Sequence, residues 1–535
     1  MKLETDLPIE IPNDITGLKD FALTMLFEND LLKQEIKKLK AWAVDLEEKL
    51  RLQRLKKYAP TSEKNPDQLD LGLFNEAEDL VANEDASPSE EEEEEAEPEK
   101  KKRAPGGGRK PLSKDLPRED CLIDFTAEEK EKLTSEGKLL TKISEEVSEK
   151  LKYTPAKISV LRFIRPVYKI TSINSEPTNI VDREAVEIKT PEMPPSIIDK
   201  GIATPELLAV IATNKYYFGL PLYRQENYFK MIDASITRQS MAKWIIEASK
   251  KITPIYNFLQ EMLLLRDYLQ MDETTIQVLN EEGKKATSKS YMWVRHSFEG
   301  APIILFDYFK NRSGDVPVEL LRDFKGYLQI DGYDGYNKAI KLYNLVRVGC
   351  MDHSRRKFFE AVKVSFNKKI AKRCLALIDK LYEIEKEIED KPADEKKTIR
   401  QTKSTLIFDL LEEYLKEQRP KIPPTSVLGK AISYFENEKE FLKRYLENGR
   451  LKISNVFVEN KIRPFSIGRK NWLFSSSVDG ANASGMFYSL IETAKANGIN
   501  PEEYLTVLFR EIPKALKTEN YDYESLLPLK THYKF

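Results

Sequence analysis

Residues 266–353 carry the pattern that most restricts how this chain can fold. Three apolar or alternating runs come first: DYLQMDETTIQVL, SKSYMWVRHSF and APIILFDYFK. A helical segment, SGDVPVELLRDF, follows, and then two further strand candidates, YLQIDGYDGY and LVRVGCMDH, on either side of the helical NKAIKLYN. Alternation with a period of two is typical of strands that bury one face, and the short gaps between the first three runs predict an antiparallel meander.

The resulting order of three strands, helix, strand, helix and strand is that of an RNase H-like α/β core, in which the first and fourth strands are neighbours. Residues 354–450 have the pattern of long charged helices and are predicted to form a large helical insertion. The core then resumes over 451–512, and 513–535 form a C-terminal tail. Within the resumed core, residues 451–475 are expected to be loop-like and basic, and the next helix candidate is 480–497.

Residues 17–57, within a first unit of 1–64, are predicted to form one long helix. Apolar residues recur every seven positions with charged residues between them, at Leu18, Met25, Leu32, Leu39 and Leu46. A heptad pattern sustained over more than three repeats favours a coiled coil and therefore self-association. The alternative is a single amphipathic helix that packs on its own chain.

A strongly acidic linker is expected over residues 65–108. Its segment 76–99 holds 13 Asp and Glu and no Lys or Arg, and such a block of like charge cannot bury a core. The net charge of −2 becomes +11 when these acidic residues are set aside, so the remaining chain is basic. A basic surface suits a polyanionic partner such as DNA, although a Lys-rich surface without such a partner fits equally well.

Two smaller regions precede the strand-rich segment. Residues 109–200 are predicted to form a small β-containing domain, and 201–265 return to helix. Here LPLYRQENYFKMI, a short break and a second helix capped by Ser235 or Thr237 are compatible with a helix-turn-helix that reads DNA. The second helix carries Arg238 and Lys243; a purely structural helical hairpin is equally compatible.

Cysteine use and hydropathy indicate a cytoplasmic protein. The chain has three cysteines, no CxxC pair and an odd count, which argues against a disulfide framework. No apolar run approaches the ~20 residues of a membrane span, so no membrane association is expected. His353 is interpreted as structural or as a phosphate contact, without a partner nearby in sequence for binding a metal.

The chain resembles transposases of the insertion sequence 66 family in motifs that follow the family's order. These are YAPTSEK, GGGRKPL with LPRE, GLPLYRQE, QMDET, NRSGDVPVELLRDFKGYLQIDGYDGY, CMDHSRRKF, IRPFSIGRKNWLF and SLIETAKANGINPEEYL. The resemblance extends from about Leu18 to the C-terminal LLPL, which is nearly the whole chain.

The resemblance implies a DDE-type DNA transposase with a leucine zipper and a DNA-binding region before an RNase H-like catalytic core. The family's Asp-Asp-Glu triad falls on Asp272, Asp331 and Glu492. Two Mg²⁺ ions, for which Mn²⁺ can substitute, would be held by this triad. Expected partners are double-stranded DNA at element ends and target sites, a second copy of the chain, and small accessory proteins.

One departure from the family concerns zinc. Members of the family usually carry a Cys-rich zinc knuckle after LPRE, but between Asp124 and Thr204 there is neither Cys nor His. A structural zinc site needs about four such ligands at short spacing. We therefore predict no zinc.

The spacing of the carboxylates suits the expected core. Asp272 lies in the first strand candidate, and Asp331 follows a later strand 59 residues on, so adjacent strands would bring them together. Glu492 follows after 161 residues, which requires the helical insertion. An Asp at a strand end is often only a turn or cap former. The nearby rivals are Asp307, Asp334 and Asp352, whereas Glu273 should point to the opposite sheet face.

Basic residues in two further segments are candidates for contacts with DNA phosphates. They are Arg355, Arg356, Lys357, Arg463, Arg469 and Lys470. Three other functions remain open at this stage: a catalytically inactive DNA-binding protein derived from a transposase, an RNase H-like nuclease without strand transfer, and a coiled-coil scaffold that binds nucleic acid.

Overall fold

A computed structural model of the 535-residue chain describes residues 14–58, 135, 158–170, 187–199 and 201–531. The acidic linker expected over 65–108 and most of the small domain expected over 109–200 lie outside these residues. In the described part of the chain, no helix combines the length and the apolar character needed to cross a membrane.

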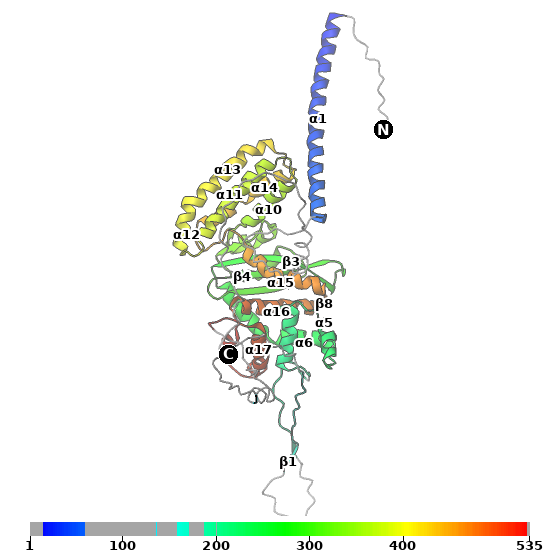
Figure 1. Cartoon of the computed structure of the whole chain (residues 1–535), viewed down its shortest axis with the longest axis vertical. Coiled ribbons are helices and arrows are strands. Elements are labelled where there is room, and N and C mark those ends of the chain that lie inside the picture. Colours follow the sequence, from blue (N-terminus) through cyan, green and yellow to red (C-terminus); the bar gives the residue numbers. More distant parts are fainter. Residues whose placement is uncertain (1–13, 59–134, 136–157, 171–186, 200, 532–535) are drawn as a thin grey trace, which may run out of the picture. The chain divides into compact units, whose positions relative to one another are not determined.

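A mixed sheet forms the centre of the structure (Figure 1). Its strands and the helices between them have these bounds: β3 Tyr268–Asn280, β4 Lys289–Ser297, β5 Ile303–Phe309, α8 Asp315–Leu320, β6 Tyr327–Gln329, α9 Asn337–Tyr343, β7 Val346–Val348 and β8 Ser475–Ser477. The predicted order of strands and helices over 266–353 is therefore confirmed.

Strand β3 lies in the middle of the strand order β5-β4-β3-β6-β7. Strands β3, β4 and β5 pair antiparallel as the predicted meander, while β6 and β7 add parallel strands on the other side. The first and fourth strands of this region, β3 and β6, are neighbours, as expected. Strand β8 pairs parallel with the far half of β3.

Helix α15 (Val456–Trp472) runs along β3, so the expectation of a loop over 451–475 is wrong for most of that segment. The amide of Gln270 in β3 is bonded to the start of the helix, and Arg469 near its end donates to Thr274 and Thr275. The helix accommodates Pro464 in its interior. Tertiary contacts with the sheet therefore outweigh the helix-breaking tendency of proline.

Helix α16 (Val478–Ala496) covers the free edge of β5. Phe306 N–H donates to Ser489 Oγ at 2.8 Å, and Ile304 N–H donates to Thr493 Oγ1 at 3.0 Å. Gly485 permits this close approach, because a Cβ there would lie 2.7 Å from the Phe306 carbonyl oxygen. The helix thus satisfies edge groups that would otherwise be open to pairing with another strand.

The remaining helices around the sheet share its hydrophobic core: α4 Pro205–Tyr216, α5 Leu222–Met231, α6 Arg238–Lys251, α7 Thr253–Leu264 and α17 Pro501–Ala515. Before them in the sequence, β1 Tyr168–Ile170 and β2 Glu187–Lys189 form an antiparallel pair. Thr237, one of the two predicted caps, accepts a hydrogen bond from Ser240 N–H at the start of α6. Arg238 and Lys243 are exposed on α6.

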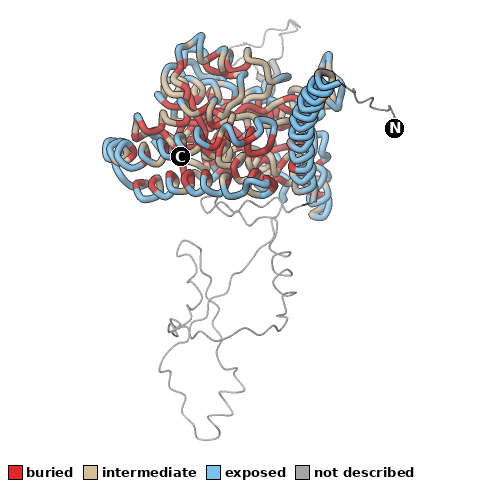
Figure 2. The backbone as a smooth tube through the Cα atoms, turned by 90° about the horizontal axis from the view of Figure 1, so that it is seen from above, coloured by how far each residue is buried: buried red, intermediate tan, exposed pale blue. Residues whose placement is uncertain are grey.

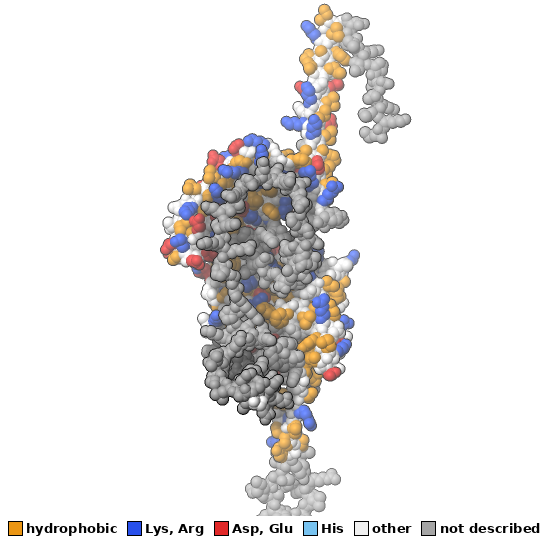
Figure 3. Space-filling view, viewed as in Figure 1, with side chains coloured by type: hydrophobic (Ala, Val, Ile, Leu, Met, Phe, Trp, Pro, Cys, Tyr) orange, Lys and Arg blue, Asp and Glu red, His pale blue; other side chains and the backbone are white. Residues whose placement is uncertain are grey.

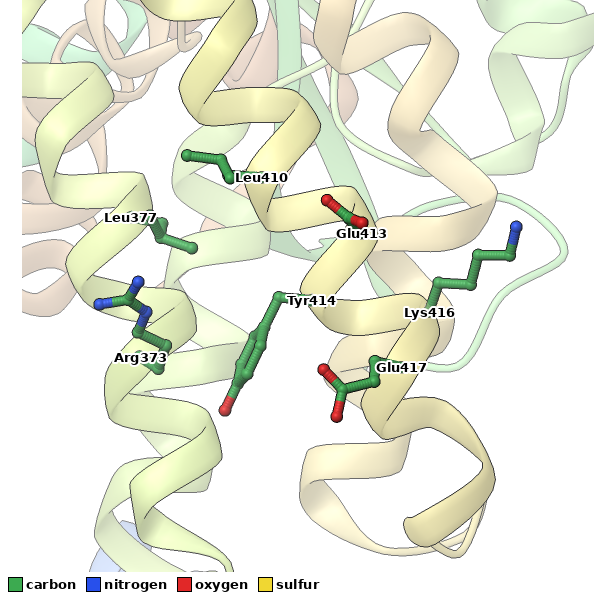
Figure 4. Close-up of a pocket in the computed structure, with 7 residues that line it drawn as sticks. All are labelled: Arg373, Leu377, Leu410, Glu413, Tyr414, Lys416 and Glu417. Atoms are coloured by element: carbon green, nitrogen blue, oxygen red, sulfur yellow. The ribbon is translucent and has the colours of Figure 1, made fainter.

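A second, helical core lies between β7 and α15 in the sequence. Its elements are α10 Met351–Val364, α11 Lys368–Glu387, α12 Ala393–Ile399, a π-helical turn Arg400–Ser404, α13 Thr405–Gln418 and α14 Val427–Lys443. The buried guanidinium of Arg400 donates to both carboxylate oxygens of Glu385, at 2.6 and 2.8 Å, which joins the π-helical turn to α11. A surface pocket lies between α11 and α13, where Tyr414 is placed between Arg373 and Glu417 (Figure 4).

Helix α1 (Ile15–Tyr58) is continuous, which confirms the helix predicted over 17–57. Near its end, Glu48 is buried and accepts from the backbone N–H groups of Phe366 and Val427 in the helical core. The five heptad residues of the predicted coiled coil are exposed, and apolar side chains follow the helix on its surface (Figures 2 and 3). The end of the helix therefore packs on its own chain, and the coiled coil of the exposed part stays a prediction.

His296 on β4 should make stability depend on pH. Burial, with a smaller contribution from the charge of Lys461, lowers the pKa of His296 to about 3, and its Nδ1 has no hydrogen-bond partner in the described part of the chain. Because this pKa lies below the ~6.5 of an unfolded-state histidine, the unfolded chain takes up the proton first as the pH falls. The free energy of unfolding should therefore fall between pH ~6.5 and ~3, by at most about 1.4 kcal/mol per pH unit from this group.

Urea denaturation at a series of pH values checks this expectation. The variant His296→Leu should show a shallower decrease in unfolding free energy over this window, whatever its stability at neutral pH. Identical slopes for the two proteins would contradict the assignment.

Candidate active site

Asp272 lies in β3, and Asp331 follows the neighbouring strand β6 by two residues. The parallel register pairs Gln270 of β3 with Gln329 of β6, and each aspartate follows its glutamine by two residues. Asp272 accepts a hydrogen bond from Glu273 N–H at 2.8 Å, and Asp331 accepts one from Tyr333 N–H at 3.0 Å. The structure thus brings together the two predicted aspartates.

Glu459 brings a third carboxylate to this place. It lies in the first turn of α15, and the preceding residue, Val458, donates its N–H to Gln270 Oε1 at 3.2 Å. Gln270 Nε2 also donates to Ser454 O at 3.2 Å, so the start of α15 is fastened to β3. Gln270 and Asp272 share one face of the sheet, because side chains alternate along a strand.

The charges of these carboxylates interact strongly. Burial, followed by the negative charges of Glu273 and Glu459 and then Asp331, raises the pKa of Asp272 well above its usual range. Glu459 Oε1 is buried and has no hydrogen-bond partner among the described residues. Like charges in a buried place repel unless a cation lies between them. The carboxylates and the unpartnered oxygen therefore fit hard divalent cations such as Mg²⁺.

Glu273 points to the opposite face, as expected from strand alternation. It forms an ion pair with Arg312 and accepts a 2.6 Å hydrogen bond from Tyr336 Oη. Burial raises the pKa of Glu273, while Tyr336 and Arg312 oppose that shift. The side chain is engaged on its own face and leaves Asp272 as the β3 carboxylate of the site.

Glu492, the predicted third member of the triad, is not brought to the two aspartates. It lies on α16 beside Thr493, which is bonded to Ile304 of β5. Strand β4 separates β5 from β3, so the backbones of those strands are roughly 10 Å apart, and that of β6 is roughly 5 Å further away. The carboxylate of Glu492 is buried and accepts from Lys495 Nζ at 2.7 Å.

The loop that carries Asp331 is held by the helical core. Arg347 on β7 donates to the Asp331 carbonyl at 3.1 Å and to Glu438 Oε2 of α14 at 2.6 Å. The ring of Tyr434, also on α14, lies against Gly332, where a Cβ would come within 2.8 Å of Tyr434 Cε2. Helix α14 therefore fixes the backbone on both sides of the Asp331 carbonyl.

The rival aspartates have other partners. Asp307 is paired with the buried Arg295 at 2.9 Å and accepts from Tyr256 Oη. Asp352 accepts from Tyr382 Oη, and Asp334 accepts from Asn337 Nδ2 at 3.2 Å. These contacts assign a structural role to Asp307, Asp352 and Asp334.

Several predicted DNA contacts are engaged within the chain. Arg355 donates to Asp379 at 2.8 Å, Lys357 lies over the Tyr434 ring at 4.7 Å, and Arg469 is bonded to β3. Burial lowers the pKa of Arg469. The other predicted DNA contacts, Arg356, Arg463 and Lys470, are at least partly exposed. Arg356 also forms an ion pair with Glu459 Oε2 at 3.6 Å.

Two features of the site were missed in the sequence. Glu459 in VFVENKIRP lies in the segment 451–475, for which a loop was expected, and so it was not considered. The interpretation of His353 as a residue without a nearby ligand partner is wrong, because Cys350 precedes it by three residues and lies beside it. The C-x-x-H spacing in GCMDH was the available signal.

A mixed sheet with partly buried carboxylates on β3 and in the loop after β6, and a third carboxylate on a packed helix, could hold divalent cations through oxygen ligands. The chain belongs to the transposase IS66 family, whose model matches residues 200–483, more than half of the sequence. Residues 489–529 match the IS66 C-terminal element, and 45–121 match a model described as transposase C of IS166 homeodomain. The resemblance seen in the motifs is thereby confirmed.

Relatives in Sinorhizobium fredii (strain NBRC 101917 / NGR234) have a similar extent. The uncharacterized protein y4qI is 29% identical over 399 residues, which are 72% of this chain and 71% of y4qI. The uncharacterized protein y4jD is 28% identical over 429 residues, 78% of this chain and 81% of y4jD. The transposase match contains Asp272, Asp331 and Glu459, whereas Glu492 falls in the C-terminal element.

The Arg347–Glu438 pair should be needed for stability. Both side chains are nine-tenths buried or more, and burial raises the pKa of Glu438 while Arg347 opposes that shift. Arg347→Ala leaves a buried carboxylate without its partner and should reduce the free energy of unfolding by about 3–5 kcal/mol. Urea denaturation measures this change.

The double variant Arg347→Met with Glu438→Leu is the matched control. It removes both charges and should recover most of the lost stability, but it cannot restore the bond to the Asp331 carbonyl. An exposed ion pair contributes at most about 1 kcal/mol. If the unfolding free energy of Arg347→Ala lies within about 1 kcal/mol of that of the original protein, the proposed role of this pair is contradicted.

Proposed function

We propose that the chain is a DDE-type DNA transposase whose RNase H-like core uses Asp272, Asp331 and Glu459 as its triad, in place of the Glu492 expected from sequence. The observation that carries this proposal is the approach of Asp331, after β6, and Glu459, on α15, to Asp272 on β3. The strand register and the Gln270 bond to α15 set them there, and both negative charges raise the pKa of Asp272. Two Mg²⁺ ions, or Mn²⁺ in their place, would be held there.

The reaction proposed is cleavage of a phosphodiester at the ends of a mobile element, followed by transfer of the resulting 3′-OH into target DNA. Bound divalent cations would activate the attacking oxygen and stabilise the leaving oxygen. The chain itself fixes the geometry: Gln270 holds α15 against β3, and Arg347 holds the Asp331 loop. No covalent protein–DNA intermediate is required, so no Ser or Tyr nucleophile is invoked.

The substrate proposed is double-stranded DNA. Arg356 beside Glu459 is placed to neutralise a phosphate close to the carboxylates. Arg238 and Lys243 on α6, together with Lys470 at the end of α15, are exposed and would contact the phosphate backbone at a greater distance. The α5–α6 pair is the proposed DNA-binding region.

Self-association through α1 is part of the proposal. An exposed heptad stripe of apolar residues, with charged residues between them, is covered when two such helices pair. The buried Glu48 near the end of α1 fastens the helix to its own core, so the free stripe N-terminal to it is the pairing surface.

Side-by-side carboxamide variants test the triad. On DNA carrying the ends of the element, Asp272→Asn, Asp331→Asn and Glu459→Gln should each lower Mg²⁺-dependent cleavage by more than about 100-fold, because even groups behind the metal ligands are worth about 10–100-fold. Glu492→Gln, which keeps the shape and an acceptor for Lys495, should cleave within a few-fold of the original protein.

The reverse result, with Glu492→Gln inactive and Glu459→Gln active, would contradict the proposed triad. Cleavage without joining of the 3′-OH to target DNA would identify a nuclease. DNA binding without any metal-dependent cleavage by the unaltered protein would identify an inactive transposase derivative.

Light scattering of the full chain tests the pairing surface. The double variant Leu32→Glu with Leu39→Glu places charges in the apolar stripe and should lower the molar mass to that of a monomer. Lys37→Glu, on the opposite side of the same helix, is the control and should leave the mass unchanged. Equal masses for all three proteins would refute pairing through this stripe.

A further inference from the structure

A group of three different metal-binding side chains lies beside the proposed triad. Cys350 precedes α10, His353 is in its first turn, and Glu459 is in the first turn of α15. One ligand atom from each residue lies within 4.8 Å of the other two. Met351 N–H donates to Ile453 O at 3.0 Å, which ties the start of α10 to the segment that leads into α15.

Two of these ligand atoms have no other partner. His353 Nδ1 and Glu459 Oε1 are buried, 3.7 Å apart, and form no hydrogen bonds among the described residues. Two ligands of a tetrahedral zinc ion, with bonds of about 2.0–2.2 Å, lie roughly 3.4 Å apart. The observed separation is therefore close to that of a metal-binding pair. Buried polar atoms without partners are uncommon in folded proteins and call for an explanation.

Cys350 has a partner that does not account for the group. Its thiol donates to Asn455 Oδ1 at 2.8 Å, which by itself is an ordinary structural contact. That contact leaves the imidazole nitrogen and the carboxylate oxygen unexplained. The His353 and Glu459 side chains are each about one-fifth exposed, at 23% and 21%, so an ion from solvent can reach them.

The chemistry of the three ligands selects a metal other than Mg²⁺. Magnesium prefers oxygen ligands in octahedral geometry, whereas sulfur and imidazole suit zinc. Three protein ligands with a fourth open position are typical of accessible zinc sites. Binding would release the thiol proton, because the thiolate is the ligand.

We propose that Cys350, His353 and Glu459 form a binding site for Zn²⁺ or a metal of the same class, next to the Mg²⁺ site and sharing Glu459 with it. Zinc binding rests on the geometry of these three residues. Its consequence rests on the proposed function: a zinc ion that takes Glu459 withdraws it from the triad and inhibits DNA cleavage.

Cobalt(II) absorption tests the site without DNA. Full-length protein titrated with Co²⁺, a spectroscopic substitute for Zn²⁺, should develop a sulfur-to-cobalt charge-transfer band that added Zn²⁺ removes. The band should be lost in Cys350→Ser. It should persist in Cys374→Ser, which alters another buried free cysteine, and in Cys121→Ser.

The other two ligands are tested by competition with a chromophoric chelator. His353→Ala and Glu459→Gln should each weaken Zn²⁺ binding by at least about 10-fold. Absence of the charge-transfer band, or a band that survives in Cys350→Ser, would overturn the proposal.

Cleavage assays then separate this proposal from the proposed function. Zinc should inhibit the Mg²⁺-dependent reaction, and Cys350→Ser should need at least about 10-fold more Zn²⁺ for the same fractional inhibition of its own rate. A cobalt band without DNA cleavage would leave the metal site standing and the transposase proposal in doubt. DNA cleavage without the cobalt band would support the transposase proposal and overturn the metal site.

Discussion

Mutual repulsion among partly buried carboxylates is the constraint on which the arrangement around β3 depends. Burial and the charges of Glu273, Glu459 and Asp331 all raise the pKa of Asp272, so a structure without cations holds these groups together at a cost. Fixed hydrogen bonds hold the surrounding backbone: Gln270 fastens α15, and Arg347 fastens the Asp331 carbonyl. At the proposed cation site, binding would therefore need no rearrangement of the backbone.

The helical segment between β7 and α15 contributes to this site as well as to its own core. Glu438 pairs with Arg347, and Tyr434 packs against Gly332, so α14 supports the loop of Asp331 from outside the sheet. Helix α14 therefore supports the backbone of the Asp331 loop through one polar and one packing contact. A substitution in α14 that removes these contacts should alter the position of the Asp331 loop, even though α14 supplies none of the three carboxylates.

The sequence predicted the strands because alternation and short gaps are local features. The strand order of an RNase H-like core, in which the first and fourth strands are neighbours, then set Asp272 beside Asp331. The third carboxylate was not predictable in this way. A loop was expected over 451–475, yet contacts between α15 and β3 keep most of that segment helical despite Pro464. Glu492 had a matching motif, but its helix is held at the β5 edge by Ser489 and Thr493, which sequence spacing does not reveal.

The central claim is that Glu459 completes the cation site with Asp272 and Asp331. Anomalous diffraction from crystals soaked in Mn²⁺ tests it most directly, since Mn²⁺ can stand in for Mg²⁺. The account predicts manganese peaks within about 2.0–2.3 Å of oxygens from these three residues, with none at Glu492. A manganese ion bound by Glu492 together with either aspartate, with Glu459 uninvolved, would contradict it.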